Sequence, residues 1–267
     1  MAASSALQPL IARAAALVDA AERVLVLTGA GISTDSGIPD YRGPQGVWTK
    51  NPGAEKMATL EHYLTDPEIR KRSWRSRLDT PIFRAEPNDG HAAIVELEKR
   101  GKLHALVTQN VDGLHLKAGT SPEKLVEIHG HVRDVVCWSC GERAPMEKAL
   151  DRVRAGEEDP PCHTCGGILK SATISFGQQL ERADVLRMDH AAMTCDLVLA
   201  VGSTLSVWPA AGAVPRALRH GAKLIIVNQE RTEFDAEADV VLRASISEVL
   251  PAIVRGGSPP PPDGAPA

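Results

Sequence analysis

The sequence predicts an α/β fold in which helices flank a parallel sheet and a smaller module is inserted. Three observations support this prediction. Short apolar runs of strand length alternate with stretches of helical spacing, and each run ends in glycine or polar residues, as strands do at the ligand-binding edge of a parallel sheet. Two Cys-x-x-Cys pairs stand between the third and fourth runs. The runs lie at 24–28, 103–108, 125–128, 196–201, 223–227 and 240–242.

Composition limits the classes of partner. The chain has 267 residues, a net charge of −4 and only 3% aromatic residues, so its core must be built from Val, Leu, Ile and Ala. This charge creates no global field that favours nucleic acid or a membrane surface. No apolar run approaches membrane-spanning length, and the first residues lack the basic segment of a signal peptide. We therefore expect a cytoplasmic monomer that binds neither nucleic acid nor membranes.

Helix signals lie before and between the predicted strands. Apolar residues spaced three or four apart between 7 and 18 predict an amphipathic N-terminal helix. Thr65 or Asp66 is expected to cap a second helix that runs to about residue 78, and a third covers 91–100. Residues 35–43 are a loop rich in glycine and proline.

The stretch at 24–33 (VLVLTGAGIS) joins an apolar strand to a glycine turn. Glycine lets the backbone bend sharply, and its missing side chain lets a diphosphate approach the main-chain N–H groups. A single Gly-x-Gly also occurs where a strand ends in glycine for packing alone. If the sheet forms as predicted, however, five polar or glycine-rich strand ends line one crevice. They are 29–33, 109–112, His129, 202–204 and 228–230.

The two cysteine pairs have the spacing of a four-thiolate zinc site. Thiolates two residues apart on a tight turn both reach one metal ion, and two such turns complete a tetrahedron. Sulfur fills every position, so the zinc is expected to be structural and to hold a module that lacks a core of its own. The four ligands are Cys137, Cys140, Cys162 and Cys165, and Cys195 is expected to be an inert buried thiol.

Several motifs stand in the order found in sirtuins, the NAD-dependent protein-lysine deacylases, and the chain resembles the bacterial members of that family. The resemblance covers about 24–251, almost the whole chain, and it is specific because independent motifs recur in order. They are GAGIS at 29–33, GIPDYR at 37–42, TQNVDGLH at 108–115, HG at 129–130, the cysteine pairs, GST at 202–204 and VN at 227–228.

The resemblance implies a Rossmann-like NAD-binding domain, a smaller inserted zinc-binding domain and a helical module. NAD, consumed as a co-substrate, and an acyl-lysine protein or peptide would occupy the cleft between them. The expected divisions are 1–34, 81–130 and 178–255 for the NAD-binding domain, 35–80 for the cofactor loop and helical module, 131–177 for the zinc module, and 256–267 for a disordered tail.

The resemblance also implies roles for single residues. His129 would be the general base, and its Ile-His-Gly context selects it among nine histidines. Asn110 and Asp112 would grip the nicotinamide carboxamide. From its position just after them, His115 is expected to cap or orient their turn. The further residues implied to contact NAD are Gly29, Ala30, Gly31, Thr34, Asp40, Tyr41, Arg42, Gln109, Gly202, Ser203, Thr204, Asn228, Gln229 and Ala244.

The chain departs from the family at the acyl end. Sirtuins that prefer acidic acyl groups carry Tyr-x-x-Arg on the helix that lines the acyl pocket, where this chain has Trp74 and Arg77. Arg77 can pair with an acyl carboxylate, or it can be an ordinary exposed arginine. Deacetylation is therefore the default, and succinyl or longer acyl groups stay open. Phe176 and Val207 are expected in the peptide groove.

Two other functions compete with deacylation. A protein mono-ADP-ribosyltransferase could use the same NAD site, and a non-enzymatic adaptor could combine an NAD sensor with a zinc ribbon. The combination of His129, Asn110 and Asp112 favours deacylation over transfer. The roughly balanced charge of 131–177 disfavours a nucleic-acid-binding ribbon.

Overall fold

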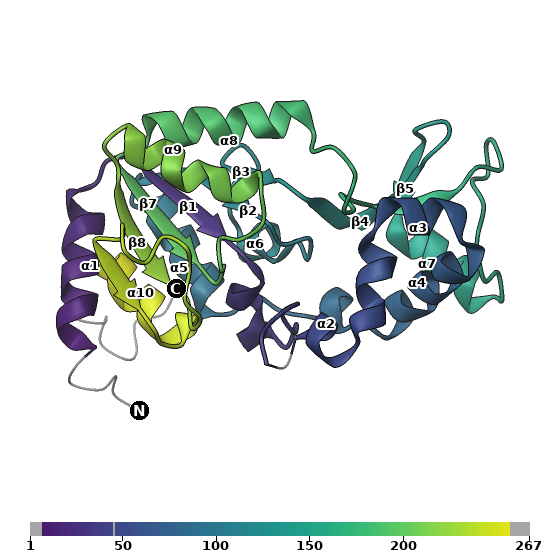
Figure 1. Ribbon diagram of the computed structural model, residues 1–267, viewed down its shortest axis with the longest axis horizontal. Coiled ribbons are helices and arrows are strands. Elements are labelled where there is room, and N and C mark those ends of the chain that lie inside the picture. The colour runs from purple at the N-terminus through teal and green to yellow at the C-terminus, as the bar shows by residue number, and fades with distance from the viewer. Residues whose placement is uncertain (1–6, 45, 257–267) are drawn as a thin grey trace, which may run out of the picture.

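The computed structural model describes residues 7–44 and 46–256, which form a larger and a smaller body (Figure 1). The larger body contains a parallel sheet of order β3-β2-β1-β7-β8-β9. The chain pairs β1 with β2 on one side and later returns to pair β7 on the other, which puts a topological switch at the carboxyl end of β1. The strands are β1 (Val24–Thr28), β2 (Leu103–Thr108), β3 (Leu125–Glu127), β7 (Leu197–Val201), β8 (Lys223–Val227) and β9 (Val240–Leu242).

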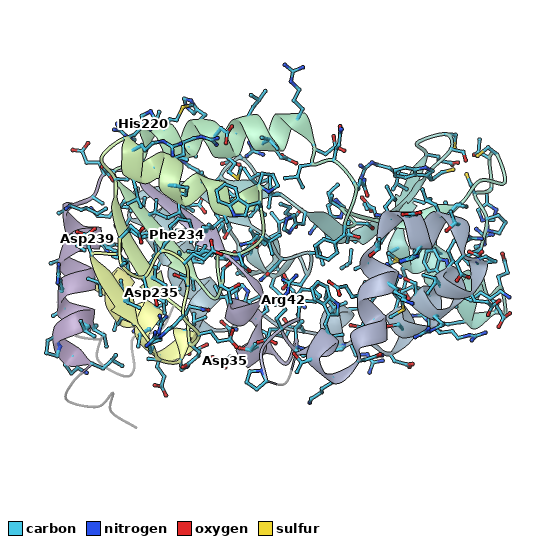
Figure 2. All side chains as sticks on the ribbon, in the orientation of Figure 1. Asp35, Arg42, His220, Phe234, Asp235 and Asp239 are labelled. Carbon is cyan, nitrogen blue, oxygen red and sulfur yellow. The ribbon has the colours of Figure 1, made fainter. Side chains whose placement is uncertain are left out.

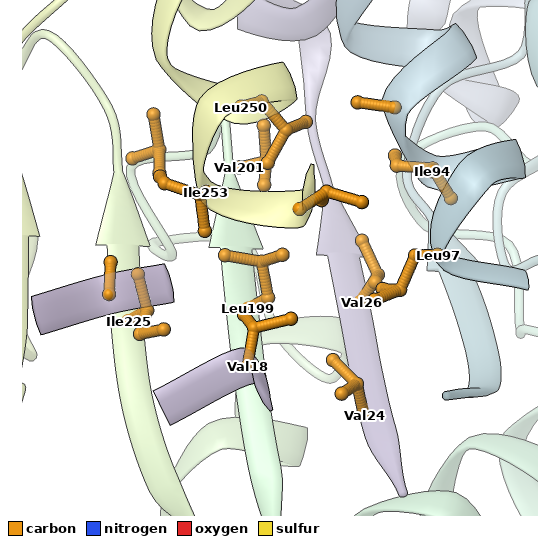
Figure 3. Packing of buried hydrophobic residues seen from close by; sticks show 14 of the residues in the cluster. Val18, Val24, Val26, Ile94, Leu97, Leu199, Val201, Ile225, Leu250 and Ile253 are labelled. Carbon is orange, nitrogen blue, oxygen red and sulfur yellow. The ribbon is translucent and has the colours of Figure 1, made fainter. Parts of the chain in front are cut away.

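Helices cover both faces of this sheet, and alternate side chains of each strand point to opposite faces. Val24 and Val26 pack against α1 (Gln8–Ala20), α5 (Asp89–Lys99) and α10 (Ile246–Arg255) (Figure 3). Their neighbours Leu25 and Leu27 pack on the other face, against α8 (Arg182–Thr194) and α9 (Ala213–Arg219). The parallel sheet flanked by helices, with its aliphatic core, confirms the predicted fold class.

The smaller body combines an antiparallel sheet with helices from an earlier part of the chain. Its sheet has the order β5-β4-β6 and consists of β4 (Gly130–Cys137), β5 (Arg143–Pro145) and β6 (Leu169–Thr173). A small apolar cluster joins Val135 of β4 and Leu150 of α7 (Met146–Arg154) to Trp74 of α4 (Pro67–Asp79). The helical segment and the cysteine-bearing segment therefore share one core.

The region between β1 and α5 contains the predicted loop, which begins after η1 ends at Ser36, and several short helices before the predicted helix α4. Asp66 is the cap of α4, because its side chain accepts hydrogen bonds from the main-chain N–H groups of Glu68 and Ile69. The remaining short elements are η1 (Ala30–Ser36), α2 (Val47–Lys50), η2 (Pro52–Ala58), α3 (Leu60–Thr65), η3 (Pro81–Phe83), α6 (Leu114–Ala118) and η4 (Ala210–Gly212).

The predicted N-terminal helix is confirmed as α1, with Ile11, Ala14 and Val18 buried. The predicted tail, 256–267, lies outside the described residues except for Gly256. Across 7–44 and 46–256, no helix combines the length and the apolar character needed to cross a membrane.

Candidate active site

A cavity of about 1240 Å³ opens at the carboxyl edge of the parallel sheet and extends to the smaller body. The strand order places it where β2 and β7 flank the end of β1. The strand ends that were expected to converge do so, because one residue from each of the five lines this cavity. These residues are Gly29, Asn110, His129, Gly202 and Asn228.

The glycine turn after β1 packs directly on the glycine turn after β7. The main-chain N–H of Gly31 donates to the carbonyl oxygen of Gly202 at 2.9 Å. A side chain on Gly31 would lie only 2.7 Å from Gly202 Cα, and Gly202 has a φ of +64°. The two glycines let the backbones meet and leave a main-chain surface, free of side chains, that a phosphate-bearing ligand can approach.

Asn110 is held so that one polar atom remains for a ligand. Its Nδ2 donates to the carbonyl oxygen of Gly29 at 3.0 Å and to Ser33 Oγ at 3.1 Å. Ser33 Oγ in turn donates to Asp112 at 2.7 Å. Both amide hydrogens of Asn110 are thus used, and its Oδ1 is left as an acceptor. An acceptor is what the NH₂ group of a carboxamide requires.

His129 offers an unprotonated ring nitrogen. Its Nδ1 lies 3.1 Å from the carbonyl oxygen of Gln109, and a carbonyl oxygen only accepts, so Nδ1 carries the ring proton. Nε2 is then free to take a proton from a ligand. Burial lowers the pKa of His129, and the hydrogen bond to Gln109 opposes this shift. The basic form therefore predominates at neutral pH.

The loop after η1 is joined to the segment after β6 by aromatic rings that pack at tilted angles. The ring centroids of Tyr41 and Trp48 lie 4.7 Å apart, and those of Trp48 and Phe176 lie 5.5 Å apart. The guanidinium of Arg42 lies 4.7 Å from the centroid of the Trp48 ring, on the loop between the two bodies (Figure 2). Arg42 lines the cavity, where its charge suits a diphosphate.

Polar side chains beside β7 and β8 form another part of the wall. Gln109 Nε2 donates to Ser203 Oγ at 3.0 Å, which links the ends of β2 and β7. Asn228 Nδ2 donates to the carbonyl oxygen of Glu230 at 2.9 Å, and Arg243 donates to the carbonyl oxygen of Asn228 at 2.7 Å. These bonds order the polar strand ends before any ligand binds.

Two cations line the part of the cavity that belongs to the smaller body. Arg77 of α4, partly buried, donates to Ser171 Oγ at 3.0 Å. Lys170 of β6, only 2% exposed, donates to the carbonyl oxygens of Ser171 and Thr173. Within the described part of the chain, neither cation forms an ion pair with a carboxylate. Burial, followed by the charge of Arg77, lowers the pKa of Lys170 to about 7.

The four cysteines of the two pairs gather at one point of the smaller body. Their sulfurs all lie within 4.8 Å of one another, with 3.5 Å between Cys137 and Cys165 and 3.8 Å between Cys140 and Cys162. Zn–S bonds of about 2.3 Å in a tetrahedron separate the sulfurs by roughly 3.8 Å. The cluster therefore fits one zinc ion with four thiolate ligands. It lies outside the cavity wall, as a structural site should.

Three of the residues predicted to contact ligands do not line the cavity. Asp112 accepts a hydrogen bond from Ser33, which in turn accepts one from Asn110. Ala244 packs against the core of the larger body. Trp74 is fully buried in the core of the smaller body and does not line the cavity, whereas Arg77 on the same helix does. The other predicted NAD and substrate residues all line the cavity, Arg77 among them.

Sequence reasoning missed Lys170, although a signal was present. A lysine inside the short strand 169–173 (LKSAT) is unusual because an ammonium group is rarely fully buried without a partner. The charged residue in that run could have indicated a polar cavity at this strand.

Comparisons with known proteins agree with this architecture. The Sir2 family model matches residues 29–209. NAD-dependent protein deacetylase 2 of Streptomyces coelicolor is 51% identical over 233 residues, which are 87% of this chain and 97% of the relative. A structure of Sir2 with a p53 peptide and NAD⁺ has a TM-score of 0.81 and 30% identity, over 90% of this chain and 95% of that one. A structure of Sir2 with a deacetylated p53 peptide and 3′-O-acetyl-ADP-ribose has a TM-score of 0.85 and 29% identity, over 94% and 98%. The chain belongs to the Sir2 family, the sirtuins.

Proposed function

We propose that this sirtuin is an NAD-dependent protein-lysine deacylase with deacetylation as its default reaction. One observation carries the proposal: His129, with a free ring nitrogen, and Asn110, with a free amide oxygen, line the same cavity as the glycine turn. A general base, a carboxamide acceptor and a main-chain surface for phosphates thus belong to one site. The Streptomyces relative is named for this reaction, and the two Sir2 structures contain NAD⁺ and 3′-O-acetyl-ADP-ribose.

Different residues bind different parts of NAD. The glycine turn and Arg42 hold the diphosphate, and the polar ends of β7 and β8 hold the adenosine. Asn110 accepts a hydrogen bond from the nicotinamide carboxamide, while Ser33 and Asp112 keep its amide oriented. The acyl oxygen of the modified lysine attacks the anomeric carbon of the ribose, and nicotinamide leaves.

His129 completes the reaction as a base. It takes a proton from a ribose hydroxyl, and the freed oxygen attacks the acyl carbon. One water molecule is consumed when the bond between the acyl carbon and the lysine nitrogen breaks, and the products are free lysine, nicotinamide and acyl-ADP-ribose. The lowered pKa of His129 keeps the ring unprotonated and ready at neutral pH.

A protein or peptide substrate would enter beside Phe176 and Val207. Both line the cavity, and Phe176 is 40% exposed. An extended peptide that pairs with the main chain on both sides of this entrance would present its modified lysine to His129. Hydrogen bonds between main chains depend little on the side chains of the peptide, so we expect broad peptide specificity.

A second candidate concerns the acyl group, and Lys170 and Arg77 favour it. Lys170 and Arg77 line the cavity wall of the smaller body, and neither pairs with a carboxylate of residues 7–44 and 46–256. Placing an unpaired ammonium group in a buried wall is unfavourable, and a ligand carboxylate relieves this. We therefore propose that the protein also removes acidic acyl groups such as succinyl.

The proposed deacylation is tested by incubating the protein with NAD and an acetyl-lysine peptide and following both by mass spectrometry. The peptide should lose its acetyl group only when NAD is present, and His129→Ala should abolish the loss. His220→Ala is the matched control, because His220 is exposed and far from the cavity. Transfer of ADP-ribose to a protein acceptor without loss of acyl groups would instead favour a mono-ADP-ribosyltransferase. Binding of NAD without its consumption would favour an adaptor.

The acyl preference is tested with acetyl and succinyl peptides of the same sequence. Arg77→Met should lower the ratio of kcat/KM for succinyl over acetyl by about tenfold, the effect of one charged hydrogen bond. Arg75→Met is the matched control, since Arg75 lies on the same helix but is exposed and pairs with Glu158. An unchanged ratio in Arg77→Met would reject the acidic acyl group and leave deacetylation intact.

The domain divisions, the compartment and the oligomeric state stay predictions. The separate apolar clusters of the two bodies support the division between an NAD-binding domain and a zinc module, although Trp74 joins the helical module to the latter. Four thiolates that bind zinc agree with the reducing cytoplasm. Light scattering of the purified protein tests the predicted monomer.

A further inference from the structure

A line of buried hydrogen bonds leads from Asn110 into the interior of the larger body. The main-chain N–H of Asn110 donates to Thr108 Oγ1 at 3.1 Å, and Thr28 Oγ1 donates to the same oxygen at 2.8 Å. Thr28 Oγ1 also lies 3.0 Å from His115 Nε2. Thr28, Thr108 and His115 are at most 2% exposed, and none of them lines the cavity.

The direction of the bond between Thr28 and His115 follows because a threonine hydroxyl has only one hydrogen to donate. The hydroxyl of Thr28 has one hydrogen and donates it to Thr108, so it must accept from His115. The ring proton of His115 therefore lies on Nε2. Its other nitrogen, Nδ1, is an acceptor that is buried and has no partner within 7–44 and 46–256.

His91 stands at the far end of this line. His91 Nδ1 lies 3.3 Å from the main-chain nitrogen of Asn88 and 3.1 Å from Asn88 Oδ1, which leaves Nε2 as the ring nitrogen outside the cap of α5. This nitrogen is also buried without a partner among the described residues. The ring centroids of His91 and His115 are 4.9 Å apart. Burial lowers the pKa of both rings, so two neutral imidazoles lie against each other.

We infer that His115, supported by His91, is a positioning residue for the nicotinamide pocket. His115 orients the hydroxyl of Thr28, and the two threonines hold the main chain of Asn110. The Asn110 side chain has separate partners in Gly29 and Ser33, so its free oxygen is placed by two independent sets of bonds. The inference rests on the proposed function, since that function makes this oxygen the acceptor for the carboxamide.

The first test needs no variant and no activity. Long-range proton–nitrogen correlation NMR on the full-length protein at pH 7 reports the tautomer of each imidazole ring. We expect neutral rings for both His115 and His91, with His115 protonated on Nε2. A charged ring, or His115 protonated on Nδ1, would overturn the inference whether or not the protein is a deacylase.

The second test separates positioning from stability. His115→Leu should lower kcat/KM for NAD and weaken inhibition by nicotinamide, each about tenfold, the effect of one buried hydrogen bond. His115→Gln places an amide N–H near the position of Nε2 and should recover both to within about twofold. The KM for the peptide should not change, because the peptide groove beside Phe176 and Val207 does not depend on the hydrogen bonds that run from His115 to Asn110. His104→Leu is the matched control, since His104 also contacts a threonine hydroxyl, at 2.8 Å from Thr194, but at the other end of β2.

Thr28→Val supplies a check that does not depend on the folding of the histidine variants. Valine has nearly the shape of threonine but lacks the hydroxyl that links His115 to Thr108. Thr28→Val should therefore lower kcat/KM for NAD and weaken nicotinamide inhibition as His115→Leu does. The double variant should be no worse than the poorer single variant, because both changes remove the same coupling. Additive effects, or normal nicotinamide inhibition in Thr28→Val, would contradict the inference. If the wild-type protein does not consume NAD, the proposed function fails, and the NMR result still decides the orientation of His115.

Discussion

Gly31 and Gly202 meet backbone to backbone, joined by a hydrogen bond of 2.9 Å, and a Cβ on Gly202 would lie 2.4 Å from the main-chain nitrogen of Ile32. Gly202→Ala should therefore separate the two turns and destabilise the protein by on the order of 3 kcal/mol, from steric overlap and backbone strain together. Urea unfolding measures the loss.

Gly221→Ala separates these two causes. Gly221 has a φ of +88°, so alanine is strained there too, but no atom of the described residues would lie within 4 Å of its Cβ. We expect a loss of about 1 kcal/mol from strain alone. Equal losses in the two variants would show that the close approach of Gly31 and Gly202 is not tight.

The pH dependence of activity should reflect the lowered pKa of His129. The ring is a base only when unprotonated, so activity falls as the pH drops through its pKa. Burial places that pKa below the ordinary 6.5, and the acid limb of kcat/KM should therefore have its midpoint below 6.5. A midpoint at or above 6.5, measured with NAD and acetyl peptide at several pH values, would contradict this assignment.

Removal of zinc should unfold the smaller body before the larger one. The smaller body has a limited apolar core, and the four thiolates join the turn after β4 to the turn before β6. A chelator, or Cys162→Ser, should lower the melting temperature and abolish deacylation. Cys195→Ala is the matched control because Cys195 is a buried cysteine of the larger body. Retention of 1 mole of zinc per mole of Cys162→Ser would argue against the four-cysteine site.

The buried His91 should make the fold sensitive to acid. Burial lowers its folded-state pKa to about 4, while the unfolded chain keeps about 6.5. The unfolded state then binds more protons between these values, so this contribution is fully present above pH 6.5 and is lost as the pH falls to about 4. The difference corresponds to on the order of 3 kcal/mol.

Comparison of two variants isolates that effect from the titration of carboxylates. The free energy of unfolding of His91→Gln should depend less steeply on pH between 4 and 6.5 than that of the wild-type protein. His220→Gln, which changes an exposed histidine, should keep the wild-type slope. Identical slopes in all three proteins would show that His91 is protonated without unfolding.

Local features of the sequence were sufficient to predict the larger body. Each strand of the parallel sheet is a short apolar run, since a strand buried on both faces has no polar side, and polar residues or glycine mark its end. Parallel strands bring their carboxyl ends to one edge, so Gly29, Asn110, His129, Gly202 and Asn228 could be assigned to one cavity before the structure was known. The cysteine spacing predicted the thiolate cluster for a similar reason, since a Cys-x-x-Cys turn has few geometries.

The smaller body was harder to predict because its residues take their places from contacts between distant segments. Whether Trp74 or Arg77 faces the cavity depends on which side of α4 packs against Val135 and Leu150. The burial of Lys170 likewise depends on the position of β6 beside that helix. Periodicity within α4 does not contain this information.

By itself, then, the sequence determined the sheet, its ligand-binding edge, the zinc ligands and the membership of the family, because strand composition, glycine turns and ligand spacing act over a few residues. Only the tertiary structure decided that Asp112 stands behind Ser33, that Lys170 and Arg77 share a wall, and that His91 and His115 lie 4.9 Å apart. These relationships join residues on different elements. Their distances are set by how whole helices and strands pack, and no local pattern along the chain records that packing.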